Sequence, residues 1–316
     1  MTIPSPGLGT WKIPDDLAPS IVHTAVELGY RHLDCACDYG NEPAVAKGIA
    51  SALADNLCTR DQLHVTSKLW NTYHAPEHVR PACERSLNDL GLDHLDLYLV
   101  HFPITLAYVP FDVRYPPGWF HDPDADQPAM KHDPVPYADT WGAMEELVDA
   151  GLVKNIGVCN LNISLLRDLL SYARIKPANH QVEIHPYLTQ PRLLRFCQEN
   201  GISVTAFSPL GADSYIPLDM ATSNDRVLAD PVVTKIAAEH ARTPAQVALR
   251  WASQRGTIPI PKTQSPQHLA ENLAINNFTL TGEQMAAIDA LDRHQRFNDP
   301  AVFGEAAFNT FYPIFD

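Results

Sequence analysis

The sequence predicts an α/β protein built as a (β/α)8 barrel (TIM barrel) of parallel strands. Eight short β-rich segments alternate with amphipathic stretches, and several are apolar along most of their length, as strands buried on both faces are. Eight parallel strands close a barrel, and 316 residues suit such a barrel with additions. We therefore expect one barrel domain over residues 1–316.

The eight predicted strands are spread along the chain in a regular alternation. They cover Gly7–Trp11, Tyr30–Ala36, Gln62–Leu69, Leu95–Phe102, Asn155–Asn160, Ala178–Ile184, Ser203–Pro209 and Thr257–Thr263. Helical periodicity covers Tyr137–Ala150, Asp230–Arg242, Pro244–Gln254 and Glu283–Asp292. A doubly wound sheet is the alternative, but the first strand lacks the G-x-G-x-x-G that such folds use for dinucleotides.

Two segments fall outside this alternation. Residues Pro103–Pro136 include eight prolines and little periodicity, which predicts a long loop after the fourth strand. Loops of this length inside a domain are usually functional. The tail, Arg293–Asp316, holds six phenylalanine or tyrosine residues, and we expect it to be irregular and to pack on the protein.

Composition limits the possible partners. The formal net charge of −14 argues against nucleic acid as a partner, because an acidic chain repels phosphate backbones. The sequence contains no run of about 18 apolar residues, so we expect no membrane span. The first residues lack the pattern of a signal peptide. The six cysteines show no framework spacing, which predicts reduced thiols and a cytoplasmic protein.

The residues at the ends of the predicted strands point to chemistry. Active residues of a barrel lie at the carboxyl ends of its strands. In chain order these ends hold Trp11, Asp34 with Tyr39, Lys68, His101, Cys159 with Asn160, Gln181, Phe207 with Ser208, and Lys262 with Thr263. A purely structural barrel would not need polar groups at nearly every strand end.

Four of these residues can together reduce a carbonyl group. Asp34 can pair with Lys68, and a lysine cation beside Tyr39 favours the phenolate, so we expect a lowered pKa and a competent general acid. His101 could donate a hydrogen bond to the same carbonyl oxygen. No side chain can supply a hydride, so a nicotinamide cofactor is required.

Several motifs then identify a resemblance that covers essentially the whole chain. They are GLGTW at 7–11, LDCACDYGNE at 33–42, SKLWNTYH at 67–74, LVHFP at 99–103, GLVKNIGVCN at 151–160, QVEIHPYL at 181–188, AFSPLG at 206–211, IPKT at 260–263 and AEN at 270–272. Together they resemble the aldo-keto reductase superfamily. The stretches VPFDVRYPPGW at 109–119 and RFNDP at 296–300 bring the likeness closest to the yeast-type xylose reductases.

The resemblance implies a role for each matching residue. Asp34, Tyr39, Lys68 and His101 would be the catalytic tetrad, with Tyr39 as proton donor. The sugar pocket would be lined by Trp11, Asp38, His101, Phe102 and Asn298. The cofactor, NADPH or also NADH, would be bound by Cys159, Asn160, Gln181, Phe207, Ser208, Leu210, Ser214, Lys262, Thr263, His268, Glu271 and Asn272.

Departures from the family pattern qualify these expectations. Cys159 replaces a serine, Phe207 stands where tyrosine is common, and His268 stands where an arginine usually grips the 2′-phosphate. An arginine offers a permanent, bidentate charge that histidine lacks, so this departure predicts use of both cofactors. Lys262 is retained, so we expect some preference for NADPH to remain. Only six residues precede Gly7, so we expect the family's N-terminal β-hairpin to be missing or reduced.

Structural roles are the alternative for several of the same residues. Asp34 with Lys68 could be a buried structural ion pair, Asn298 could cap a turn, and Trp119 could be plain core. Cys35 and Cys37 fit no common zinc spacing, so we expect no metal.

The substrate and the state of assembly stay open. The predicted function is reduction of an open-chain aldose such as xylose. The alternatives are a broad carbonyl or aldose-phosphate reductase and a non-catalytic cofactor-binding barrel. Neither a monomer nor a homodimer is excluded by the sequence.

Overall fold

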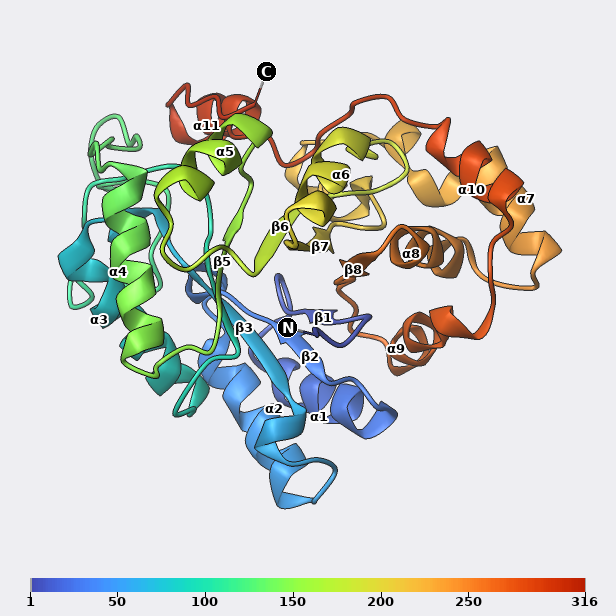
Figure 1. The fold of residues 1–316 in the computed structure, drawn as a ribbon, viewed down its shortest axis with the longest axis horizontal. Coiled ribbons are helices and arrows are strands. Elements are labelled where there is room, and N and C mark those ends of the chain that lie inside the picture. The colour runs from blue at the N-terminus through green and yellow to red at the C-terminus, as the bar shows by residue number, and fades with distance from the viewer. Residues whose placement is uncertain (1, 316) are drawn as a thin grey trace.

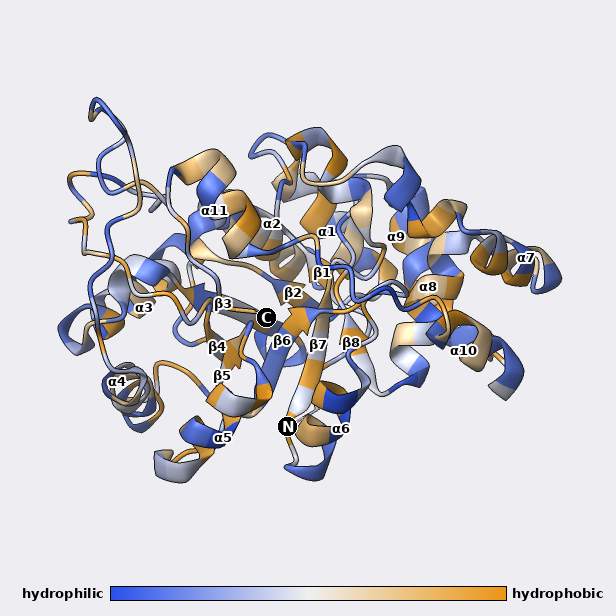
Figure 2. Ribbon diagram, turned by 90° about the horizontal axis from the view of Figure 1, so that it is seen from above, coloured by the Kyte–Doolittle hydropathy of each residue, from blue (hydrophilic) through white to orange (hydrophobic). Residues whose placement is uncertain are grey.

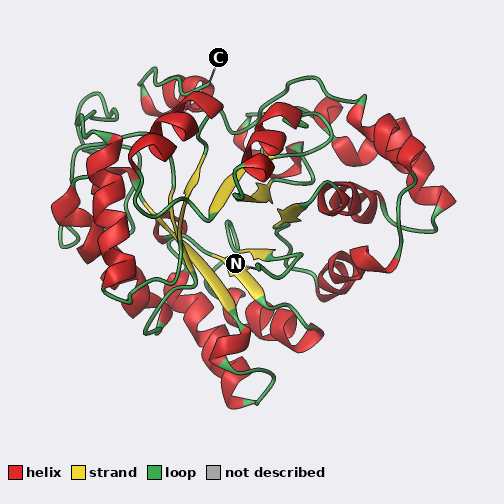
Figure 3. Cartoon of the chain, viewed as in Figure 1, coloured by secondary structure: helices red, strands yellow, loops and turns green. Residues whose placement is uncertain are grey.

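The eight strands pair in the order of the chain, and each neighbouring pair is parallel. In this computed structural model, which describes residues 2–315, the helices surround the strands (Figures 1 and 3). The strands are β1 (Leu8–Gly9), β2 (His32–Asp34), β3 (His64–Leu69), β4 (Leu97–Val100), β5 (Ile156–Cys159), β6 (Asn179–Glu183), β7 (Ser203–Phe207) and β8 (Thr257–Pro259).

The sheet closes on itself between its first and last strands. The amide N–H of Gly7 donates to the Pro259 carbonyl at 3.0 Å, and that of Gly9 donates to the Pro261 carbonyl at 3.1 Å. Gly9 lies so close to β8 that a Cβ atom there would meet the Ile260 carbonyl oxygen at 2.8 Å. The predicted (β/α)8 barrel is therefore confirmed.

The helices follow the strands in the expected alternation. They are α1 (Ala18–Leu28), α2 (Glu42–Ala54), α3 (Pro76–Leu90), α4 (Tyr137–Asp149), α5 (Ile163–Tyr172), α6 (Pro191–Glu199), α7 (Pro231–Glu239), α8 (Pro244–Gln254), α9 (Pro266–Leu273), α10 (Gly282–Asp289) and α11 (Pro300–Phe308). Figure 2 shows hydrophobic and hydrophilic residues interspersed along these helices, which bury one face against the strands.

All eight predicted strands exist, and each is shorter than predicted. The predicted Tyr30–Ala36, for example, becomes β2 at His32–Asp34, although Cys35 and Ala36 are fully buried. A run of apolar residues indicates burial rather than strand pairing. Residues in the loops above the barrel are also buried, so the apolar runs extend beyond the paired strands.

The helices begin and end where local side chains satisfy the backbone. Thr243 and Gln246 form a capping box at the start of α8, as Thr281 and Gln284 do for α10. Gly151 adopts φ 73° two residues after the end of α4, at Asp149, in the left-handed conformation that commonly ends a helix.

The C-terminal tail departs from the sequence prediction. We expected an irregular segment, yet α11 occupies Pro300–Phe308 and begins where the Asp299 side chain accepts from the Ala301 amide. Its periodicity is weak because Ala and Gly occupy several positions, so the helix depends on packing against the rest of the molecule. The long loop after β4 is confirmed, since 103–136 contains neither helix nor strand.

The sequence predicts that a hairpin before the first strand is missing or reduced. Within residues 2–7 no strand precedes β1. Ile3 instead lies in a buried cluster with Leu97, Leu99 and Cys159, so an apolar side chain fills the space under the strands. Among the described helices, none has the length and apolar character needed to cross a membrane.

Candidate active site

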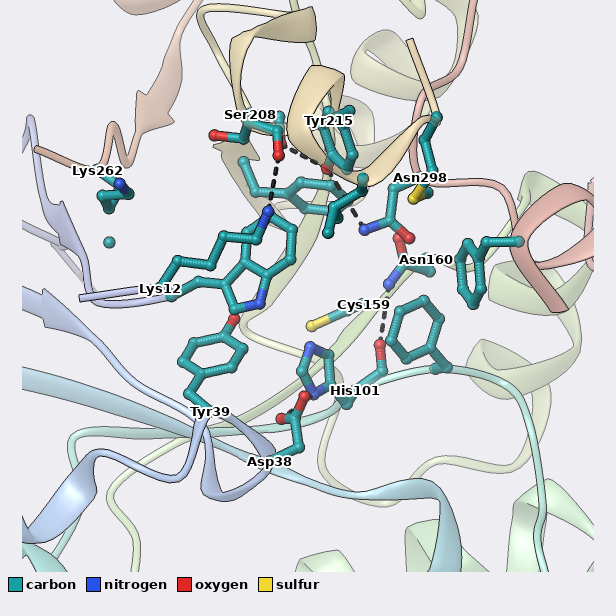
Figure 4. A pocket seen from close by; sticks show the side chains of 18 of the residues that line it. Lys12, Asp38, Tyr39, His101, Cys159, Asn160, Ser208, Tyr215, Lys262 and Asn298 are labelled. Carbon is teal, nitrogen blue, oxygen red and sulfur yellow. Dashed lines mark hydrogen bonds and ion pairs between the residues drawn. The ribbon is translucent and has the colours of Figure 1, made fainter. Parts of the chain in front are cut away.

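The residues predicted at the strand ends gather around one cavity of about 770 Å³ at the carboxyl end of the barrel. Asp34 is the last residue of β2, Lys68 lies one residue before the end of β3, and His101 directly follows β4. Figure 4 shows Tyr39, His101 and Asn160 pointing into this cavity from different elements.

Tyr39, Lys68 and Asp34 are joined by direct hydrogen bonds. The Lys68 Nζ atom donates to Asp34 Oδ1 at 2.6 Å, to the Cys35 carbonyl at 2.8 Å and to the Tyr39 hydroxyl at 3.1 Å. The Lys68 side chain is completely buried. An unpaired charge there would cost several kcal/mol, so Asp34 is needed to hold the ammonium beneath the phenol.

The ionisation of Tyr39 differs from our expectation. Burial raises the pKa of the phenol above its ordinary range, and Lys68 only partly opposes this. Burial lowers the pKa of Lys68, but the charges of Asp34 and Tyr39 reverse this and raise it overall. The prediction of a lowered tyrosine pKa was therefore wrong, because removal of the phenol from water outweighs one nearby cation.

A raised pKa suits a proton donor. The phenol keeps its proton at neutral pH, and an alkoxide is a stronger base than a phenolate, so proton transfer to a reduced carbonyl oxygen remains favourable.

His101 faces the same end of the cavity. Its Nδ1 atom lies 3.1 Å from Asp38 Oδ1, and its ring packs edge-on against Trp70 with the centroids 5.4 Å apart. The ring of Tyr39 also lies edge-on to His101, with the centroids 6.0 Å apart. The imidazole is thus held beside the phenol, with Asp38 as its charged neighbour.

An aromatic wall lines the outer part of the cavity. Trp11 and Phe102 lie on it, and Trp119 from the long loop joins them. Trp119 packs against Phe303 and Phe308 of α11, with centroids 5.1 and 5.6 Å away. The long loop and the tail helix therefore close this side together, and Trp119 belongs to the pocket as well as to the core.

The next strands supply amides and a hydroxyl. Asn160 Nδ2 donates to the His101 carbonyl at 2.9 Å, while its buried Oδ1 atom has no protein partner. Gln181 Nε2 donates to Asp34 Oδ2 at 2.6 Å. Asn160 and Ser208 adopt left-handed backbone angles, φ 61° and 49°, which are uncommon outside glycine and often occur at functional sites.

These groups fit the nicotinamide of a cofactor. The unpaired Asn160 Oδ1 can accept from a carboxamide, and Phe207 offers a flat face in the same cavity. Cys159 lies beside them, and burial raises the pKa of its thiol, so it stays neutral.

A second cavity of about 410 Å³ continues from the first, because Leu210 and Lys262 line both. Its other predicted residues are Thr263, His268, Glu271 and Asn272. Ser265 caps the start of α9 by accepting from the His268 amide at 3.4 Å. A lysine and a helix start together suit an anionic group such as a phosphate.

Lys12, which sequence reasoning missed, lines the main cavity close enough to Lys262 to feel its charge. Its Nζ atom donates to the Ser214 carbonyl at 2.7 Å and so connects the first loop with the loop after β7. Burial, and then the charge of Lys262, lower the pKa of Lys12. Two cations facing one groove fit a pyrophosphate, and the place of Lys12 beside Trp11 at a strand end was the available signal.

Tyr215 and Trp70 were also missed, although both line the main cavity. Trp70 follows β3 directly and could have been found at that strand end. Tyr215 lies in an irregular loop without periodicity, so no sequence pattern marks it. Within residues 2–315 no group of three or more His, Cys, Asp or Glu side chains is placed to hold a metal ion.

Comparisons with known proteins agree with this geometry. The profile of the aldo/keto reductase family matches residues 5–293. The NAD(P)H-dependent D-xylose reductase of Pachysolen tannophilus is 49% identical over 94% of this chain and 93% of its own length. A probable NAD(P)H-dependent D-xylose reductase, xyl1, of Arthroderma otae is 46% identical over 96% of this chain and 92% of its own.

A solved structure extends the similarity to three dimensions. The aldose reductase from Schistosoma japonicum superposes with a TM-score of 0.85 at 38% identity, covering 98% of this chain and 95% of that one. Matching profile, near full-length relatives and shared barrel lead to one conclusion: the chain is an oxidoreductase that belongs to the aldo/keto reductase family.

Proposed function

We propose that this protein uses NADPH, and also NADH, to reduce the aldehyde of an open-chain aldose, with xylose as the first candidate, to an alditol. The observation that carries the proposal is the contact of the Tyr39 hydroxyl with Lys68, 3.1 Å apart, beside amide groups that suit a nicotinamide. Relatives named as D-xylose reductases support the sugar assignment.

The proposed roles follow from the geometry. The aldehyde oxygen binds between the Tyr39 hydroxyl and His101, whose rings lie edge to face. Asn160 and Gln181 orient the nicotinamide, Phe207 stacks on it, and Cys159 lies alongside. A bound reduced nicotinamide supplies the hydride. Tyr39 then gives its proton to the carbonyl oxygen, and Lys68 stabilises the phenolate that remains.

The remaining roles concern binding. Trp11, Phe102, Asp38 and Asn298 form the sugar pocket, in which aromatic faces alternate with polar groups. The rest of the cofactor is assigned to the groove between the two cavities and to the second cavity. Its proposed residues are Ser208, Leu210, Ser214, Lys262, Thr263, His268, Glu271 and Asn272.

The charge of the long loop favours a neutral sugar over a phosphorylated one. The long loop that contributes Trp119 to the pocket carries exposed aspartates at 112, 122, 124 and 126. Asp38 lies deeper, beside His101. The acidic side chains of this loop would repel a dianionic substrate.

Initial rates of NADPH oxidation test this proposal against its alternatives. We expect turnover of xylose at a higher kcat/KM than glucose 6-phosphate. A clear preference for the phosphate would instead identify an aldose-phosphate reductase. Cofactor binding, followed by tryptophan fluorescence, without turnover of any carbonyl would identify a non-catalytic barrel.

The cofactor preference is tested by His268→Arg. The exposed His268 lies in the second cavity near Lys262. Arginine adds a permanent, bidentate charge, and a charged hydrogen bond contributes about 1.5–3 kcal/mol. We expect the Kd for NADPH to fall by about tenfold, and the Kd for NADH to stay within about twofold. Equal changes for both cofactors would show that position 268 does not contact the 2′-phosphate.

We also propose a cytoplasmic location for this protein. All six cysteines are free and buried, which suits the reducing cytoplasm. We expect a monomer or a homodimer there, with small molecules rather than nucleic acid or membrane as partners.

A further inference from the structure

Three polar side chains form a continuous row across the cavity, Ser208, Tyr215 and Asn298. The Tyr215 hydroxyl lies 2.7 Å from Ser208 Oγ, and Asn298 Nδ2 donates to the same hydroxyl at 3.4 Å. Figure 4 shows Tyr215 between the other two. The row therefore links a residue of the cofactor side to a residue of the sugar side.

The direction of these hydrogen bonds follows from what each group can do. An amide N–H only donates, so the Tyr215 oxygen accepts from Asn298. The phenol proton is then free to be donated to Ser208, whose own proton is left for another acceptor. At the other end, the buried Asn298 Oδ1 atom has no protein partner and is available as an acceptor.

The ring of Tyr215 is fixed by its neighbours. It is 1% exposed, stacks on Phe297 with the centroids 5.8 Å apart, and lies 5.9 Å from Trp11. Ring packing therefore sets where the hydroxyl lies, and removal of the hydroxyl alone leaves that packing in place.

The main chain beside Asn298 is held separately by a buried carboxylate. Glu183, the last residue of β6, is completely buried and accepts from the amides of Phe297 and Asn298 at 2.8 and 2.9 Å. The backbone of the tail is thereby tied to the barrel independently of the Asn298 side chain.

We propose that Tyr215 is a positioning residue for sugar specificity. Its hydroxyl holds the Asn298 amide nitrogen, so that the amide oxygen is presented to a hydroxyl group of the aldose chain. This inference rests on the proposed function and adds the group that selects hydroxylated aldehydes. An aldehyde without hydroxyl groups gains nothing from the oriented amide.

The test is Tyr215→Phe, which deletes one oxygen and keeps the ring. We expect the KM for xylose to rise about fivefold, because a hydrogen bond contributes about 1 kcal/mol. The kcat should change less than about twofold, since the distal hydroxyl is bound equally in ground and transition states. The KM for butanal should not change.

Tyr187→Phe is the matched control. The Tyr187 hydroxyl is also buried and donates to Asp230 at 2.9 Å, but it lies outside both cavities. We expect no change in either KM. If Tyr215→Phe raised the KM values for xylose and butanal alike, or changed neither, the proposed role would be wrong.

A double-variant cycle separates positioning from general loss of packing. Asn298→Ala should raise the xylose KM, and Tyr215→Phe added to it should have almost no further effect, because the hydroxyl acts through the amide. Additive effects would show that Tyr215 acts elsewhere.

Equilibrium binding gives a readout without turnover. Xylitol and NADPH are both reduced, so they cannot react, and calorimetric titration of xylitol into the NADPH complex measures sugar-site affinity directly. Tyr215→Phe should raise this Kd by the same factor as the xylose KM. An unchanged Kd would overturn the inference. Failure of the wild type to reduce xylose while reducing butanal would instead contradict the proposed function.

Discussion

Replacing Tyr39 by phenylalanine is expected to lower the kcat for xylose by about 10²–10⁴-fold, the usual contribution of a positioned general acid. The variant loses one oxygen, and Lys68 keeps its hydrogen bonds to Asp34 and the Cys35 carbonyl. The buried ion pair therefore survives, and the free energy of unfolding should change by no more than about 1 kcal/mol. The measurement is single-turnover oxidation of NADPH at saturating xylose.

Two comparisons make this result specific. The Kd for NADPH, measured by tryptophan fluorescence, should stay within about twofold, since Tyr39 contributes to the reacting end rather than to the phosphate groove. Tyr98→Phe makes the same chemical change in the buried strand β4, where the hydroxyl has no partner, and should retain turnover. A Tyr39→Phe variant with more than a tenth of wild-type kcat would exclude Tyr39 as the proton donor.

The second large effect concerns stability in acid. His32, His64, His74 and His180 are buried, and burial lowers the pKa of each to about 3. His180 shows the reason directly, because its Nε2 atom accepts from the Leu161 amide at 3.2 Å and must be unprotonated to do so. The folded protein therefore holds these four side chains neutral.

The sign of the effect follows from the folded and unfolded pKa values. An unfolded histidine takes up its proton near pH 6.5, whereas the folded one does so near pH 3. The contribution of each buried neutral histidine to the free energy of unfolding is therefore complete above pH 6.5. It is lost progressively as the pH falls towards 3. Each histidine contributes a slope of up to about 1.4 kcal/mol per pH unit.

One buried carboxyl acts in the opposite direction. Burial raises the pKa of Glu42 to about 7, so its protonation stabilises the fold as the pH falls from 7 towards 4.5. Over this range, Glu42 cancels the slope that about one histidine contributes to the free energy of unfolding. Because domains are stable by only about 5–15 kcal/mol, we expect the remaining slope to unfold the protein between about pH 6 and 4.

Urea midpoints at pH 7.5, 6.5, 5.5 and 4.5 measure this loss. His74→Leu should flatten the slope, since the ring of His74 has no hydrogen-bond partner and its only titration effect is burial. His294→Gln, at a side chain that is 87% exposed, is the control and should leave the slope unchanged. A midpoint that stays constant from pH 7.5 to 5.5 would contradict the prediction.

Local patterns predicted much of the fold. Each of the eight strands was found because an apolar run marks a segment buried on both faces, and helical periodicity marked α8 and α10. The helix α11 was missed because Ala, Gly and Phe provide no clear period and its stability comes from contacts with Trp119. Strand ends were overestimated because loops above a barrel are buried too.

The candidate site divides in the same way. Tyr39, Lys68 and His101 could be predicted because the carboxyl ends of parallel strands meet at one edge, so the order along the chain implies nearness in space. Tyr215 could not, because it lies in a loop whose path no periodicity describes.

The sequence by itself determined the barrel, the family and the residues around its mouth, since these depend on local patterns repeated along the chain. Only the tertiary structure decided the ionisation of Tyr39 and the link from Ser208 through Tyr215 to Asn298. The reason is physical: a pKa depends on how much water is excluded, and a hydrogen bond depends on a few tenths of an ångström between segments far apart in the chain.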